Sequence, residues 1–203
     1  MKIFCVGRNY LAHAREMNAA VPKQPVIFMK PATALADLSK PLVIPAFTND
    51  LQYELELVLR ICRDGKAIAI SEAGDYFKEW TVGIDFTARD IQSDMKAKGL
   101  PWELAKSFDG SAVLGNFVPF VEDLLPVTFS LYKNDLLAQQ GHTEDLIFSF
   151  EALIAFISKY FTLQTGDLIY TGTPAGVAKV LPGDRLSGFL NQDRLFEIEM
   201  TTA

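Results

Sequence analysis

Residues 51–59 read LQYELELVL, and their alternation of apolar and polar side chains predicts a β-strand with one buried face. The leucines and Tyr53 share one face, while Gln52, Glu54 and Glu56 share the other. The two glutamates stand about 7 Å apart at their Cα atoms, since each strand residue rises about 3.3 Å. Two like charges on one strand face repel, and a bound divalent cation would reverse that repulsion. Two interpretations stay open for this pair: a solvated strand face, or part of a cation site.

Composition limits the class of protein. The chain has 203 residues, 49% of them hydrophobic, and a net charge of −6, which suits one well-buried domain over residues 1–203. Its 19 lysines and arginines are scattered, so no basic footprint for nucleic acid is present. No apolar stretch approaches the ~20 residues that span a bilayer, and the run at residues 3–6 is too short for a secretory signal. We expect a soluble cytoplasmic protein that binds neither nucleic acid nor membranes.

The cysteines agree with that compartment. Cys5 and Cys62 are the only two, and both lie in apolar runs typical of strands. We expect buried, reduced thiols, as in cytosolic proteins. No CxxC motif and no Cys/His spacing suggests zinc.

Strands dominate the predicted organisation. Apolar and alternating runs predict strands at residues 2–6, 51–61, 80–86, 127–133 and 136–140. Apolar spacing and capping residues predict helices at residues 10–17, 71–77, 87–98 and 149–161. Helices do not alternate with strands, which argues against a βαβ array. The predicted fold class is α+β and β-rich, with a few short helices.

Asp85 ends the predicted strand at residues 80–86, just before a helix. A carboxylate in that place serves either as a helix N-cap or in function. Together with Glu54 and Glu56 it would form an all-oxygen site, which suits Mg²⁺, Mn²⁺ or Ca²⁺ better than Zn²⁺ or Cu²⁺. Glu197 and Glu199 have the same spacing but no further acid at a strand end, so we expect them to form only a solvated face.

Three other places can carry chemistry. His13 and Glu16 share one face of the helix at residues 10–17, which suits either a general base for water or an ordinary surface pair. Lys106 lies among apolar and small residues, where it can stabilise an oxyanion or extend from an edge strand to water. The Gly-rich turn at residues 171–177 offers N–H groups to a carboxylate. Walker A and GxGxxG motifs are absent, so nucleotide binding is not indicated.

Taken in order, these segments resemble the fumarylacetoacetate hydrolase family, in particular its small acylpyruvase branch. The segments that carry the resemblance are GRNY at 7–10 with His13 and Glu16, FMKP at 28–31, ELE at 54–56, DFTARD at 85–90, KGLPW at 98–102, AKSFD at 105–109, and GD at 166–167 followed by TGTP at 171–174. They occur in family order over nearly the whole chain.

The resemblance implies a mixed β-sandwich roll and a homodimer. It also implies that Glu54, Glu56 and Asp85 hold Mg²⁺ or Mn²⁺, which chelates the 2-oxo acid end of a small substrate. His13 with Glu16 would activate water, and Lys106 would stabilise the developing oxyanion or enolate. The resemblance further implies substrate-positioning roles for Arg8, Lys30, Arg89, Gln92 and Thr173.

One departure concerns the metal. The fumarylacetoacetase branch carries a larger N-terminal domain and a further acidic ligand ahead of the histidine, and Val6 occupies that neighbourhood here. We expect water to fill the extra coordination position, and we do not carry over the specificity for the larger substrate.

The leading expectation is a metal-dependent hydrolase that cleaves the C–C bond of acylpyruvates and also decarboxylates oxaloacetate. One alternative is a tautomerase or isomerase of 2-oxo or 2-hydroxydienoate diacids, which needs no water-activating pair. Another is a non-catalytic protein that binds a metal and a carboxylate. The presence of both His13 and Glu16 favours hydrolysis.

Overall fold

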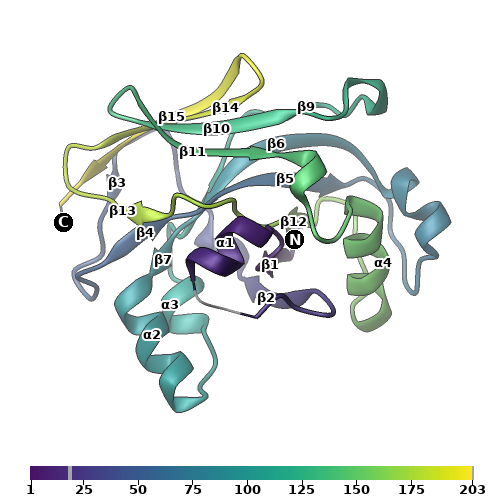
Figure 1. Cartoon of the computed structure of the whole chain (residues 1–203), viewed down its shortest axis with the longest axis horizontal. Coiled ribbons are helices and arrows are strands. Elements are labelled where there is room, and N and C mark those ends of the chain that lie inside the picture. Colours follow the sequence, from purple (N-terminus) through teal and green to yellow (C-terminus); the bar gives the residue numbers. More distant parts are fainter. Residues whose placement is uncertain (18–19, 203) are drawn as a thin grey trace.

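A seven-stranded mixed sheet positions the carboxylates singled out in the sequence (Figure 1). The computed structural model describes residues 1–17 and 20–202. The strand order is β2-β1-β12-β5-β6-β8, with β9 also paired to β6. The bounds are β1 (Ile3–Gly7), β2 (Val26–Lys30), β5 (Leu55–Ile61), β6 (Phe77–Asp85), β8 (Ala112–Leu114), β9 (Val118–Pro119) and β12 (Leu168–Tyr170).

A second sheet of five strands lies across β5 and β6 (Figure 1). Its order is β11-β10-β14-β15-β3, with bounds Leu136–His142, Thr128–Lys133, Arg185–Leu190, Asp193–Thr201 and Leu42–Val43. Leu57 of the first sheet and Phe129 of the second belong to one buried apolar cluster, which forms the core between the sheets. A small third sheet joins β13 (Ala178–Lys179), β4 (Leu51–Tyr53) and β7 (Thr87–Ala88).

Four short α-helices surround the sheets: α1 (Leu11–Glu16), α2 (Arg89–Lys98), α3 (Glu103–Lys106) and α4 (Phe150–Tyr160). Helix α4 begins at Ser149, whose hydroxyl accepts a hydrogen bond from the Ala152 N–H at 3.3 Å. Helix α2 ends at Gly99, where a φ of 66° gives the left-handed C-cap that glycine favours. Short 3₁₀ segments complete the fold at Ala32–Ala34, Ile70–Tyr76, Glu122–Leu124 and Thr143–Asp145. In the described part of the chain, no helix has the length and apolar character needed to cross a bilayer.

The predicted β-rich α+β class is confirmed, and several details differ. The helix predicted at residues 71–77 is a 3₁₀ helix at Ile70–Tyr76, with no side chain capping its N-terminus. The strand at residues 51–61 is interrupted at Glu54, so that β4 pairs with β7 while β5 pairs with β6. Cys5 is buried as predicted, but Cys62 is exposed, because it follows the last residue of β5.

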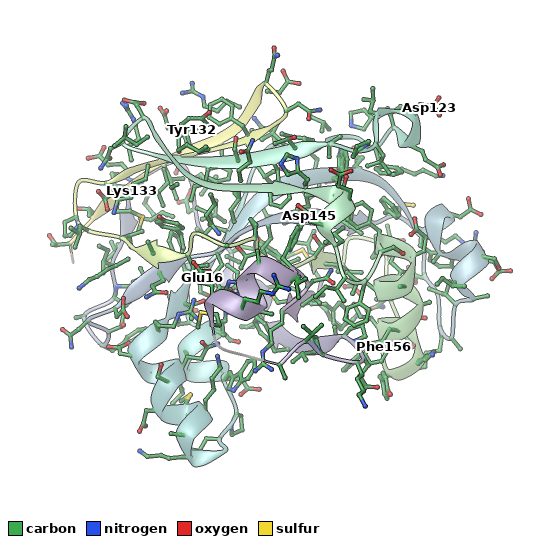
Figure 2. All side chains as sticks on the ribbon, in the orientation of Figure 1. Glu16, Asp123, Tyr132, Lys133, Asp145 and Phe156 are labelled. Atoms are coloured by element: carbon green, nitrogen blue, oxygen red, sulfur yellow. The ribbon has the colours of Figure 1, made fainter. Side chains whose placement is uncertain are left out.

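Of the two interpretations left open for residues 51–59, the solvated strand face is wrong. Strand β5 lies inside the sheet, between β12 and β6, and side chains on both of its faces are buried. Leu57 belongs to the core between the sheets, while Val58 packs with Cys5 and Tyr170 in a second apolar cluster. The glutamates of this segment are therefore surrounded by protein, with side chains filling the space between the layers (Figure 2).

Candidate functional site

Strand pairing brings Glu54, Glu56 and Asp85 together. Glu56 lies opposite Gly83 in the β5–β6 ladder, and the Asp85 N–H donates to the Glu54 carbonyl at 2.9 Å. The three residues are 6%, 2% and 1% exposed, and one side-chain oxygen from each lies within 4.8 Å of the others. Carboxylates are rarely buried without cations or hydrogen-bond donors, so the neighbours of this cluster decide what it does.

Lys106 supplies the central positive charge. It projects from α3, and its Nζ lies 2.8 Å from Glu54 Oε2, 2.7 Å from Asp85 Oδ2 and 2.6 Å from Thr87 Oγ1. Burial lowers the pKa of Lys106, but Asp85 and then Glu54 outweigh burial and leave that pKa raised. Lys106 is therefore a charged ammonium on the floor of the site.

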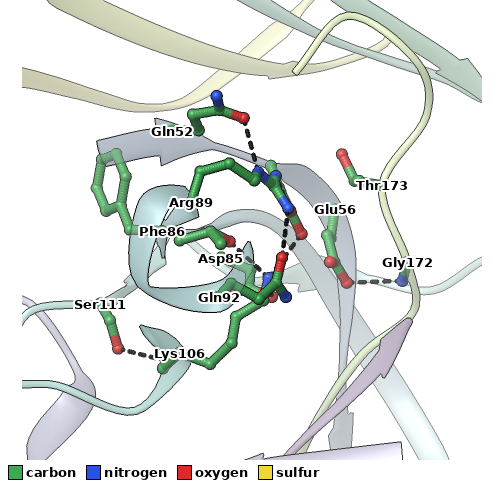
Figure 3. A network of polar contacts seen from close by, with 12 residues as sticks. Gln52, Glu56, Asp85, Phe86, Arg89, Gln92, Lys106, Ser111, Gly172 and Thr173 are labelled. Atoms are coloured by element: carbon green, nitrogen blue, oxygen red, sulfur yellow. Dashed lines mark hydrogen bonds and ion pairs between the residues drawn. The ribbon is translucent and has the colours of Figure 1, made fainter. Parts of the chain in front are cut away.

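Arg89, the first residue of α2, holds the other oxygen of Glu54. Figure 3 shows the Arg89 side chain with Gln52 and Gln92. Its guanidinium donates to Glu54 Oε1, to Gln52 Oε1 at 2.8 Å and to Gln92 Oε1 at 2.7 Å. Burial raises the pKa of Glu54, yet Lys106 and then Arg89 hold it well below its usual range. Glu54 is thus an ionised carboxylate compensated by two cations.

Glu56 has a different environment. Its Oε2 accepts a hydrogen bond from the Gly172 N–H at 2.6 Å, and no lysine or arginine pairs with it among the described residues. Burial raises the pKa of Glu56 well above its usual range, and Asp85 and Glu54 add to the effect. The turn at residues 171–177 is predicted to offer N–H groups to a carboxylate. In the structure, the Gly172 N–H binds a carboxylate of the protein itself, that of Glu56.

The structure places Lys30 behind Asp85 and away from the pocket that most of the other predicted residues line. Its Nζ lies 2.8 Å from Asp85 Oδ1 and donates to the Ser111 carbonyl at 3.1 Å and to the Ser111 hydroxyl at 3.0 Å. Fully buried and surrounded by acceptors, Lys30 supports Asp85 rather than facing a ligand. This geometry does not support the predicted contact of Lys30 with substrate.

The carboxylate cluster fits a hard divalent cation. The donors are all oxygens, which Mg²⁺ and Mn²⁺ prefer, and they converge within one small region. Glu56 has no lysine or arginine partner among the described residues. A buried carboxylate without a cationic partner is one that a divalent ion would satisfy.

A pocket of about 280 Å³ opens above these carboxylates. Buried Glu54, Glu56 and Lys106 form its floor, and more exposed side chains form its rim. Of the residues predicted from the sequence, eight line this pocket: Arg8, His13, Glu54, Glu56, Arg89, Gln92, Lys106 and Thr173. The solvated face predicted for Glu197 and Glu199 is confirmed, because both are exposed on β15, away from this pocket.

His13 and Glu16 project from α1, the short helix after β1 (Figure 1), and His13 lines the pocket. His13 is buried and its Nδ1 lies 3.1 Å from Glu16 Oε2, while Glu16 Oε1 accepts a hydrogen bond from the Gly176 N–H at 3.0 Å. The surface-pair interpretation therefore does not describe this pair, since His13 lines the pocket and its partner is anchored to a second segment.

Several lining or contacting residues were missed in the sequence, among them Thr87, Lys96 and Trp102. Thr87 belongs to no periodic pattern, and its contact with Lys106 depends on tertiary structure. Lys96 and Trp102 line the pocket rim. Lys96 follows Gln92 by four residues, and Gln92 follows Arg89 by three, so the helical periodicity of α2 alone can identify it.

Known proteins match this chain over nearly all of its length. The family model described as Fumarylacetoacetate (FAA) hydrolase C-terminal matches residues 2–202. The human protein named oxaloacetate tautomerase FAHD1, mitochondrial, is 44% identical over 186 residues, covering 91% of this chain and 84% of the relative. The protein named oxaloacetate tautomerase YcgM from Escherichia coli is 43% identical over 189 residues, covering 92% and 86%.

Solved structures match the fold as well. Fumarylpyruvate hydrolase from Pseudomonas aeruginosa, crystallised with Mn²⁺ and pyruvate, has a TM-score of 0.92 and 34% identity, covering 100% of this chain and 90% of the other. A putative fumarylacetoacetate hydrolase family protein from Yersinia pestis has a TM-score of 0.93 and 37% identity, covering 98% and 92%. With its sheets, its buried acids and these similarities together, the chain belongs to the fumarylacetoacetate hydrolase family.

Proposed function

We propose that this protein is a divalent-metal-dependent tautomerase of small 2-oxo diacids, with oxaloacetate as its representative substrate. The observation that carries the proposal is one pocket lined by Glu54, Glu56, Lys106 and His13. Asp85 completes the cluster of buried carboxylates, and Glu16 pairs with His13. Relatives named as oxaloacetate tautomerases are 41–44% identical to this chain over at least 90% of its length. On this support we propose tautomerisation ahead of the acylpyruvate hydrolysis expected from the sequence.

Glu54, Glu56 and Asp85 would hold Mg²⁺ or Mn²⁺. When bound, the cation would supply a Lewis acid to the 2-oxo acid end of the substrate and stabilise enolate charge there. Glu56 and Asp85 lie on the adjacent strands β5 and β6, and Glu54 directly precedes β5, so the sheet holds the three acids close together, which supports this assignment.

Conversion of an enol to a ketone removes a proton from the enol oxygen and adds one at C3, with no net oxidation. Lys106 stabilises negative charge on that oxygen through its ammonium group. His13 carries a proton to or from C3, and Glu16 orients its ring. Thr173 Oγ1 accepts from Gln139 Nε2 at 2.9 Å, which leaves its hydroxyl hydrogen for a substrate carboxylate.

Hydrolysis of acylpyruvates is the second candidate, and the buried His13–Glu16 pair favours it. A histidine oriented by a carboxylate can deprotonate water for attack on the far carbonyl, which breaks the C–C bond and leaves a carboxylic acid and pyruvate. Decarboxylation of oxaloacetate uses the same electron sink, and a 40% identical relative from Dictyostelium discoideum is named oxaloacetate decarboxylase. A homodimer and a cytoplasmic location stay predictions from the sequence.

The test uses purified protein with Mg²⁺ and three substrates: enol-oxaloacetate, oxaloacetate and acetylpyruvate. The disappearance of the enol is followed against buffer alone, and the products are identified as keto-oxaloacetate, pyruvate with CO₂, or pyruvate with acetate. The proposal expects rapid, chelator-sensitive ketonisation that Lys106→Met abolishes and that Glu197→Gln leaves unchanged. Ketonisation no faster than in buffer would reject tautomerase activity. Acetate formation with wild-type protein but not with His13→Ala would instead establish the hydrolase.

A further inference from the structure

Two cations of the pocket lack carboxylate partners. Arg8, Arg89, Lys96 and Lys106 supply the fixed positive charge that lines it. Arg89 pairs with Glu54, and Lys106 pairs with Glu54 and Asp85. Within residues 1–17 and 20–202, no carboxylate lies within ion-pair distance of Arg8 or Lys96. The charge of these two side chains is therefore available to an anionic ligand.

Lys96 is held so that its ammonium faces the pocket. It shares one face of α2 with Arg89 and Gln92, and its Nζ donates to Gln92 Oε1 at 3.1 Å. The same oxygen accepts from Arg89, which ties Lys96 to the network around Glu54. Lys96 Nζ also lies 5.1 Å from the centre of the Trp102 ring, a cation–π contact. Only one of its three N–H donors is used by these contacts.

Electrostatics at this position favour an anion. Lys96 as a whole residue is exposed, but its ammonium contacts Gln92 and the Trp102 ring. Desolvation and then the Arg89 charge lower the pKa of Lys96 to about 8, and Lys106 and Arg8 act in the same direction. A carboxylate placed beside Lys96 would offset the repulsion among these cations.

Arg8 approaches the same pocket from the end of β1. Its φ of 63° is left-handed, which is uncommon for a residue other than glycine and occurs mostly where surrounding contacts impose it. Those contacts come from Asn9, whose side chain donates to the Thr171 carbonyl at 2.8 Å and accepts from the Phe148 N–H at 2.7 Å. The Arg8 guanidinium makes no hydrogen bond to any described residue, so its fork of donors is open to a ligand.

Burial orders these residues by depth. Glu54, Glu56 and Lys106 are almost completely buried at the floor, Arg8 is partly buried, and Lys96 is exposed at the rim. A substrate whose 2-oxo acid end lies at the floor extends its other end toward Arg8 and Lys96. We propose that Arg8 and Lys96 form a subsite for the distal carboxylate, which makes 2-oxo diacids preferred over 2-oxo monoacids. This inference rests on the proposed function, because that function places the 2-oxo acid end at the floor.

The test compares two stable ligands that cannot enolise. Malate and 2-hydroxybutyrate share a chelating 2-hydroxy acid end, and 2-hydroxybutyrate has a methyl group where malate has its distal carboxylate. Their dissociation constants are measured by calorimetry on Mg²⁺-loaded wild-type protein, Arg8→Met, Lys96→Met and Lys96→Arg. Lys98→Met is the matched control, since Lys98 lies on the same helix but pairs with Asp94 outside the pocket.

Wild-type protein is expected to bind malate at least about tenfold more tightly than 2-hydroxybutyrate, as charge-assisted hydrogen bonds predict. Arg8→Met and Lys96→Met should each reduce this preference to about threefold or less without weakening 2-hydroxybutyrate, while Lys96→Arg and Lys98→Met keep it. With oxaloacetate, both methionine variants should raise KM about tenfold and change kcat little.

The outcomes separate this subsite from the proposed function. An unchanged malate preference in both methionine variants, with oxaloacetate still turned over, overturns the subsite and leaves the function. Equal weakening of both ligands also overturns it, because that result shows a structural role. If the methionine variants lose the malate preference but the wild-type protein does not act on oxaloacetate, the subsite is supported and the proposed function is rejected.

Discussion

Glu16 joins α1 to the Gly-rich turn at residues 171–177: its Oε1 accepts a hydrogen bond from the Gly176 N–H at 3.0 Å. The other oxygen of the same carboxylate lies 3.1 Å from His13 Nδ1. One side chain thus both fixes the position of a short helix and orients a histidine in the pocket. These two tasks can be separated, because an amide can still accept the bond from Gly176 but carries no charge.

We expect Glu16→Gln to reduce kcat for enol-oxaloacetate about tenfold or more, since His13 loses the carboxylate that orients it. Glu16→Ala should cost more, because it also removes the bond to Gly176. Neither variant should change the Mn²⁺ dissociation constant, since Glu16 is not among the clustered acids. Stopped-flow kinetics and Mn²⁺ titration provide the measurements. An unchanged kcat in Glu16→Ala would remove the pair from the mechanism.

The chain contains its own control for the metal site. We expect Glu56→Gln and Asp85→Asn to weaken Mn²⁺ binding by at least about 100-fold, because loss of a direct ligand costs more than loss of a supporting contact. Glu197→Gln and Glu199→Gln should bind Mn²⁺ as the wild type does, since this pair is exposed on β15. Electron paramagnetic resonance titration measures free Mn²⁺ directly. Equal affinities across all four variants would reject the assignment.

Lys30 predicts a stability effect. Replacement by methionine leaves the buried Asp85 carboxylate without one of its two cations, and removal of one partner of a buried pair costs about 3–5 kcal/mol. Lys40→Met is the control, because its pair with Asp37 is exposed and we expect no measurable change there. Urea unfolding of metal-free protein gives the free energy of unfolding for each. A Lys30→Met protein as stable as Lys40→Met contradicts a supporting role.

Some features of the site could be predicted from the sequence alone. Alternation in β4 and β5, the strand end at Asp85 and the helical spacing of His13 and Glu16 are local patterns, so the acids and the pair could be predicted. Recognition of the ordered family segments then linked them into one site.

Burial and contact partners could not be predicted, because they depend on segments far apart in the chain. Glu56 is buried since Gly172 lies against it, 116 positions away in the sequence. Lys30 supports Asp85 only because the loop at Ser111 completes its acceptors. The interpretation of residues 51–59 as a strand with a solvated face is wrong for the same reason: a period of two gives the faces of a strand but not what covers them.

Glu56 also predicts a pH dependence. Burial, then Asp85 and Glu54, raise its pKa above the ordinary 4.5. The folded state therefore holds this proton at pH values where the unfolded chain has released it. It follows that the free energy of unfolding of metal-free protein falls as pH rises from about 4.5 to the raised pKa, by at most about 1.4 kcal/mol per pH unit from this group.

The comparison with Glu56→Gln isolates that contribution. We expect urea unfolding between about pH 5 and pH 8 to show a shallower decline for the variant than for the wild type, because an amide does not titrate. Saturating Mg²⁺ should flatten the wild-type profile, since the cation binds the ionised carboxylate. Parallel profiles for the two metal-free proteins would show that Glu56 titrates normally.

Gly172 links the backbone of the Gly-rich turn to the metal site. Its φ of 106° is left-handed, and a Cβ atom there would lie 2.6 Å from the Asn9 Cβ. Alanine must therefore displace the turn and withdraw the N–H from Glu56 Oε2. Gly166 is the matched control: its φ is 89°, and a Cβ atom there would meet no described atom within 4 Å, so its replacement carries the backbone strain alone.

We expect both alanine variants to lose about 1–2 kcal/mol of stability from the left-handed backbone. Only Gly172→Ala should also weaken Mn²⁺ binding, by about 10–100-fold, because it removes a hydrogen bond that orients a metal ligand. Unfolding and Mn²⁺ titration on the same samples separate the two effects. If Gly172→Ala and Gly166→Ala bind Mn²⁺ equally well, the turn serves the fold and has no part in the placement of Glu56.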